Sequence, residues 1–71
     1  MEYKIGDLLE IKRNITITTN KFANLLEYAE AGQLFLIIDC VANTYTLFSQ
    51  ESGNNSAWGK MNMNYNFKKV L

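Results

Sequence analysis

Few side chains in this chain are of types that could do chemistry. Histidine, the usual general base at neutral pH, is absent from the 71 residues. Asp7 and Asp39 are the candidate carboxylates, but a Gly-Asp turn accounts for Asp7 and the end of an apolar strand accounts for Asp39. The four glycines are scattered along the chain and make no phosphate-binding loop. The sequence therefore predicts no catalytic residues and a protein that is not an enzyme.

The single cysteine, Cys40, limits redox and metal chemistry. One cysteine forms no intramolecular disulfide, and the sequence has no cysteine–histidine cluster to hold a metal. Cys40 lies inside the most apolar run of the chain, where a thiol behaves as a small buried hydrophobic side chain. We therefore expect neither a metal site nor a cofactor.

Aromatic residues are abundant, at 13% of the chain, and they favour binding over catalysis. Tyrosine and tryptophan are over-represented among the residues that carry the energy of protein interfaces. Four such residues are candidate contacts with a protein partner: Tyr28, Tyr45, Trp58 and Tyr65. The alternative role of Trp58 is to fill a small core. Met61 and Met63 are expected in the core, although adaptable methionine surfaces also bind partners.

The charges sum to zero but are unevenly spread. No basic residue lies between Lys21 and Lys60, and four acids fall in that interval: Glu27, Glu30, Asp39 and Glu51. These acids are a second candidate contact with a protein partner, suited to a basic surface or to mimicry of nucleic acid. The alternative is an ordinary solvated face.

The two ends of the chain are basic. If the first and last strands meet in space, four cations form one patch: Lys12, Arg13, Lys68 and Lys69. Such a patch, with exposed aromatic rings for stacking, supports an alternative function in nucleic-acid binding. Four charges are a weak footprint beside the strongly basic domains that bind nucleic acid, so nucleic acid is the less favoured partner.

The elements that position these residues are mostly strands. Residues 34–41 form an almost unbroken apolar run, and residues 44–49 alternate with the period of a half-buried strand. Together they predict a central β-hairpin whose turn contains Asn43, a residue type that accepts positive φ. Residues 8–11 predict a first strand, and residues 15–19 predict a second short strand or an arm of a long loop.

One helix is expected, over residues 20–31. Its apolar residues recur at helical spacing, and Gly32 supplies a stop. These residues are Phe22, Leu25, Leu26 and Ala29. We expect the stripe to cap one open end of a barrel, with a partner-binding helix as the alternative.

The last third of the chain predicts a loop and an edge strand. Residues 50–56 are polar and form the expected exposed tip. Residues 61–67 alternate large apolar side chains with asparagines, which has the period of a strand. The whole pattern predicts one mainly β domain over residues 1–71, a small barrel or curled antiparallel sheet of about five strands with one short helix.

Three stretches carry a resemblance to a known family. Residues 4–11 give a Gly-Asp-hydrophobic first strand, and residues 32–39 give a glycine-led second strand. Residues 45–48, the polar loop and Trp58 follow as third strand, distal turn and fourth-strand aromatic. This order resembles the small SH3-like barrels, of the KOW and Tudor type, found among short proteins of tailed bacteriophages. The resemblance implies an SH3-like barrel used as a general binding scaffold.

These observations predict a small phage-type interaction protein that binds, and modulates or inhibits, a host protein through its acidic or aromatic surface. The alternatives are a nucleic-acid-binding barrel and a virion or self-assembling component, in which a homo-oligomer hides apolar surface. The N-terminal residues do not read as a signal peptide, and no run approaches the roughly 20 apolar residues that span a bilayer. We therefore expect a cytoplasmic protein, in the host cytoplasm if viral, without membrane contact.

Overall fold

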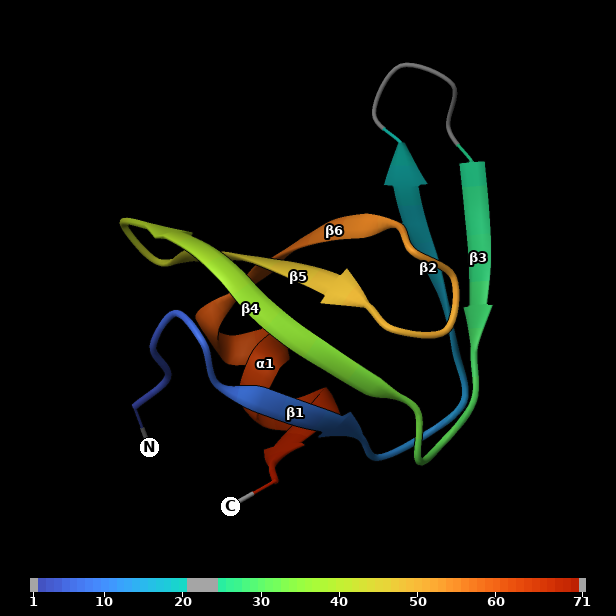
Figure 1. The fold of residues 1–71 in the computed structure, drawn as a ribbon, viewed down its shortest axis with the longest axis horizontal. Helices are drawn as coiled ribbons and strands as arrows, with labels where there is room; N and C mark the ends of the chain where they lie inside the picture. The colour runs from blue at the N-terminus through green and yellow to red at the C-terminus, as the bar shows by residue number, and fades with distance from the viewer. Residues whose placement is uncertain (1, 21–24, 71) are drawn as a thin grey trace.

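The computed structural model describes residues 2–20 and 25–70, and most of them lie in antiparallel strands (Figure 1). Five strands form a sheet in the order β6-β5-β4-β1-β7, and β2 and β3 form a separate two-stranded sheet. The elements are β1 (Leu8–Ile11), β2 (Ile15–Asn20), β3 (Leu25–Ala29), β4 (Leu34–Val41), β5 (Thr44–Ser49), β6 (Asn55–Gly59), α1 (Lys60–Asn66) and β7 (Phe67–Lys69). The expected mainly β fold, with an antiparallel five-stranded sheet and one short helix, is confirmed. Among the described residues β6 and β7 remain edge strands, so the sheet is open and not a closed barrel.

The central hairpin of β4 and β5 is confirmed. Leu47 on β5 lies opposite Ile37 on β4, and both side chains are buried. The register shifts between Ile37 and Asp39, which marks a bulge in β4. In the turn, the residue with positive φ is Ala42, at 56°, and not the expected Asn43. An alanine therefore occupies a backbone conformation in which its Cβ is crowded.

The expected helix over residues 20–31 is wrong for the part that the structure describes. Leu25–Ala29 is the strand β3, paired with β2 so that Ile15 faces Ala29 and Thr16 faces Tyr28. The β-branched residues of β2 favour an extended chain, and its backbone N–H and C=O groups need a neighbouring strand. Pairing with β3 supplies those partners, and this outweighs the helical spacing of the apolar residues. Residues 21–24 of the expected helix lie outside the described residues.

The expected edge strand over residues 61–67 is also wrong, because Lys60–Asn66 forms the helix α1. A strand would place all the alternating apolar residues on one face, whereas a helix divides them by four-residue spacing. Met63 and Phe67 form one such pair, and both are fully buried. Met61 and Tyr65 form the other pair and face solvent. Strict alternation also contains the i, i+4 pairs of a helix, so it does not distinguish the two structures.

The first and last strands meet, as the basic-patch hypothesis required. β1 pairs with β4 on one side and with β7 on the other, with Leu9 opposite Lys69. The core lies on the α1 side of the sheet, where Phe67 packs edge-to-face on Phe35 at 5.2 Å and on Trp58 at 4.9 Å between ring centres. α1 packs against β6 and β7, the strands on either side of it in the sequence (Figure 1).

Candidate functional site

The structure separates the four aromatic candidates into two groups. Tyr45 is buried, packs edge-on against Tyr3 at 5.7 Å between ring centres, and has a pKa raised by its loss of hydration. Trp58 is half-buried, and its Nε1 donates a hydrogen bond to Ser56 Oγ at 2.7 Å. These two residues belong largely to the interior. For Trp58 this agrees with the alternative that its ring fills the small core.

Tyr28 and Tyr65 lie on the surface. Their exposed fractions are 60% and 61%, on β3 and α1 respectively. Tyr65 has a neighbour that sequence reasoning did not single out as a contact, Met61, one helical turn earlier and 85% exposed. The guanidinium of Arg13 lies over the Tyr65 ring, with its carbon 3.8 Å from the ring centre. We call Met61, Tyr65 and Arg13 together the α1 face.

The α1 face is held in place from three sides. The Lys60 N–H at the start of the helix donates to the Asn43 carbonyl in the β4–β5 turn at 3.1 Å. Near the other end, the Tyr3 hydroxyl donates to Asn64 Oδ1 at 2.8 Å, and Lys12 Nζ donates to the Asn64 carbonyl at 3.1 Å. The Lys12 N–H also donates to the Asn66 carbonyl at 2.7 Å. Because carbonyls near the helix C-terminus lack intrahelical partners, these bonds fix the segment that carries Arg13 against α1.

The structure places the four cations of the expected basic patch in different environments. β1 pairs with β7, so the chain ends meet, but Lys69 Nζ lies 3.2 Å from Asp7 Oδ2 and Lys68 lies opposite Glu10. Lys69 is therefore paired with a carboxylate, and Lys68 has an acid as its cross-strand neighbour. Lys12 and Arg13 remain beside α1, where Arg13 stacks on an aromatic ring that belongs to the other candidate set. The structure thus brings Lys12 and Arg13, two of the four candidate cations, together with Tyr65, one of the four candidate aromatic contacts.

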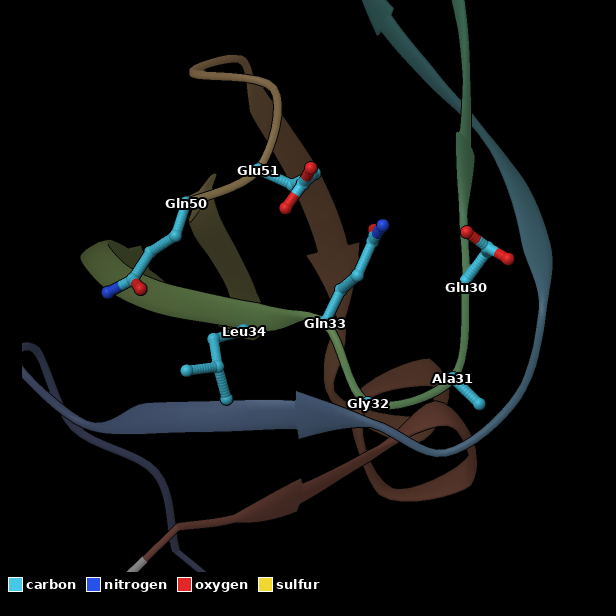
Figure 2. Close-up of a pocket in the computed structure, with 7 residues that line it drawn as sticks. All are labelled: Glu30, Ala31, Gly32, Gln33, Leu34, Gln50 and Glu51. Atoms are coloured by element: carbon cyan, nitrogen blue, oxygen red, sulfur yellow. The ribbon is translucent and has the colours of Figure 1, made fainter.

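Two of the four acidic candidates share a pocket. Glu30, directly after β3, and Glu51, after β5, line an open pocket of about 570 Å³ (Figure 2). Figure 2 shows the Gln33 side chain standing between these two carboxylates, with Gln50 on the other side of Glu51. The pocket is polar and suits donors or cationic groups.

The other two acidic candidates lie elsewhere. Asp39 is exposed on β4, and its Oδ1 accepts the backbone N–H of Cys40 at 2.8 Å. This local bond ties Asp39 to its own strand, next to the bulge. Glu27 is part of β3, and its side chain lies outside the described set. Among the three acidic candidates whose side chains are described, Glu30 and Glu51 therefore share one pocket and Asp39 lies apart from it.

Comparisons with family models, with curated proteins and with solved structures each gave no match. Within residues 2–20 and 25–70, no helix is long and apolar enough to cross a membrane. The same residues contain no group of three or more histidine, cysteine, aspartate or glutamate side chains placed to hold a metal ion. The α1 face and the acidic pocket are thus the surfaces from which a function can be argued.

Proposed function

We propose that this chain is a small interaction protein that binds a protein partner through the α1 face. In keeping with its resemblance to SH3-like proteins of tailed bacteriophages, the proposed partner is a protein of the host bacterium, and binding modulates or inhibits it. The observation that carries the proposal is the exposure of Met61 and Tyr65, at 85% and 61%, on one side of a helix whose other side is buried in the core.

The composition of the α1 face supports a protein partner. Tyrosine, methionine and arginine are the residue types enriched in protein interfaces over the rest of a protein surface. Full burial of a side chain of the size of Met61 contributes about 1.5–3 kcal/mol, so a partner that covers two such residues gains affinity from this small area. Arg13 and the backbone bonds to α1 hold the contact residues before binding, which lowers the entropy cost of association.

Nucleic-acid binding is the second candidate, favoured by the cation of Arg13 on the exposed ring of Tyr65. Single-stranded nucleic acids bind where aromatic rings and cations alternate along a groove. Lys69 adds little to such a groove because it pairs with Asp7, and the charge of Lys68 is offset by its cross-strand neighbour Glu10. This candidate predicts binding that falls steeply with salt, since each neutralised phosphate releases a counterion.

Capture from a bacterial lysate tests the proposal. Tagged wild-type protein, Tyr65→Ala and Tyr28→Ala are compared, with and without nuclease, and the retained proteins are identified by mass spectrometry. We expect a stoichiometric host protein that survives nuclease treatment, is lost with Tyr65→Ala and is kept with Tyr28→Ala. Tyr28 is the matched control because its exposed fraction, 60%, is nearly the same on another element.

The other outcomes argue against the proposal. Loss of every retained protein on nuclease treatment would indicate that the chain binds nucleic acid and not a host protein. Equal retention by wild type and Tyr65→Ala would refute the α1 face as the contact. Recovery of an oligomer of the chain alone, measured by light scattering, would instead support self-assembly.

A further inference from the structure

The charged residues on α1, and in the segment that bonds the C-terminal end of α1, are cations. α1 carries a single charged residue, Lys60, and no acid lies anywhere between residues 60 and 71. The segment that packs along the other end of the helix contributes Lys12 and Arg13, and no acid follows them before Glu27. Of the acids on β1 and before it, Asp7 pairs with Lys69, Glu10 is the cross-strand neighbour of Lys68, and Glu2 precedes Tyr3, whose hydroxyl bonds Asn64. The exposed apolar pair is therefore bordered by cations at both ends of the helix.

We infer that the partner segment that docks on the α1 face is an acidic peptide segment, with one or more carboxylates beside an apolar side chain. This inference rests on the proposed function and names the chemistry of its partner. Complementary charge at the rim of an apolar contact sets partner choice and orientation, because a like-charged partner leaves unpaired charges next to the interface. A neutral segment could bury Met61 but would offer no opposite charge to Lys12, Arg13 or Lys60. A basic segment would place like charges beside these three residues.

Arg13 is positioned to receive a carboxylate. Its stacking on Tyr65 uses the face of the guanidinium plane, whereas hydrogen bonds to a carboxylate use the edge of that plane. The two interactions are therefore compatible in one side chain. The aromatic ring also holds the guanidinium in one orientation, so less side-chain freedom is lost when a carboxylate binds. Lys12, whose Nζ bonds the Asn64 carbonyl, adds positive charge beside it.

A peptide fits the α1 face better than a nucleic acid. Met61, which is 85% exposed and the most exposed large apolar residue of those that the structure describes, has a flexible thioether that packs against irregular apolar groups. A phosphate backbone presents charge at every nucleotide and needs a row of cations, whereas the cations here flank an apolar centre. The test therefore includes a nucleic-acid probe, so that binding of nucleic acid to the α1 face would be detected.

Titration with four defined probes tests the inference. Three are five-residue peptides with a central phenylalanine, flanked on each side by two glutamates, two glutamines or two lysines, with blocked ends. The fourth is a ten-nucleotide oligothymidine. Each is added to isotope-labelled protein, and the amide signals of residues 12–13 and 60–66 are followed by NMR. We expect the glutamate peptide to shift these signals and to bind at least tenfold more tightly than the glutamine peptide.

Two variants assign the charge effect to the α1 face. Arg13→Gln should remove most of the preference for the glutamate peptide, and Lys4→Gln should keep it, because Lys4 is exposed but belongs to the turn before β1. The inference is overturned by equal binding of the glutamate and glutamine peptides, by tightest binding of the lysine peptide, or by tighter binding of the oligothymidine. Absence of signal change at residues 12–13 and 60–66 with every probe overturns it as well.

Capture from lysate separates this inference from the proposed function. A host protein that is lost with Tyr65→Ala but retained by Arg13→Gln would leave the proposed function standing and refute the acidic partner. A host protein retained by both variants would refute both. Loss with both variants, and retention by Lys4→Gln, is the result that we expect.

Discussion

Replacement of Ala42 by glycine should stabilise the fold. Ala42 has a φ of 56° in the β4–β5 turn and is exposed, so its methyl group contributes crowding without burial. The left-handed conformation costs a residue with a Cβ roughly 1–2 kcal/mol. Glycine removes that cost but loses roughly 0.5–1 kcal/mol through the greater freedom of the unfolded chain. The net gain in the free energy of unfolding is about 0.5–1 kcal/mol, since the two effects oppose each other.

Urea and thermal denaturation measure this effect. For a domain of 60–100 residues, a gain of 1 kcal/mol raises Tm by about 4–8 °C, so we expect an increase of about 2–8 °C. Ala57→Gly is the matched control, because Ala57 is also exposed but lies inside the strand β6. There the glycine should lower stability by roughly 0.5–1 kcal/mol. A lower Tm for Ala42→Gly, or equal shifts for the two variants, would refute the reasoning from the turn.

The remaining predictions concern the core and the ion pair. Met63→Ala should lower the free energy of unfolding by about 2–5 kcal/mol because Met63 is fully buried, whereas Met61→Ala should change it by less than about 0.5 kcal/mol. Similar losses in urea denaturation would contradict the assignment of their faces. The pKa of Asp7 is lowered first by the Lys4 N–H that donates to its carboxylate and then by Lys69. Its stabilising effect is therefore present above the usual aspartate pKa, about 3.9, and is lost as the pH falls through the lowered value. The urea midpoint of Asp7→Asn should accordingly vary less between neutral and acid pH than that of wild type, and parallel pH profiles would exclude the effect.

The parts of the fold that could be predicted are those in which neighbouring residues in the sequence decide the structure. The β4–β5 hairpin follows from an apolar run, a two-residue turn and a strand of period two, all within 16 residues of each other. The turn conformation was not predicted, because positive φ falls on Ala42, the first turn residue, and not on Asn43. A two-residue hairpin turn can place positive φ at its first position alone, and there the position decides rather than the residue type.

The two errors arise where one spacing fits two structures. The apolar residues of the expected helix over 20–31 have helical spacing. Leu25–Ala29 nevertheless pairs with β2, and the spacing of residues within 20–31 does not predict this pairing. Residues 61–67 have the alternation of a strand, yet the same positions contain the pairs Met63–Phe67 and Met61–Tyr65 of a helix. Only the packing of the whole chain chooses between these interpretations.

The candidate site shows the same division. Tyr45 could have been placed in the core from the sequence, because it shares one face of β5 with Leu47 in a strand of period two. The exposure of Tyr65 could not, since it depends on α1 being a helix. Met61 was missed as a contact for the same reason, and the i, i+4 spacing between Met61 and Tyr65 is the signal that could have revealed it.

The pairing of β1 with β7 also sets when the molecule can fold. Leu9 and Lys69 are register partners from opposite ends of the described chain, and the Lys12–Asn64 bond that supports the α1 face spans almost as many residues. Contacts of such large sequence separation slow folding, because a long loop must close before they form. On the ribosome, β1 has no β7 to pair with until residues 67–69 have left the exit tunnel. The binding surface therefore forms only after synthesis has passed this point, and a nascent chain that is still short of it presents no α1 face to a partner.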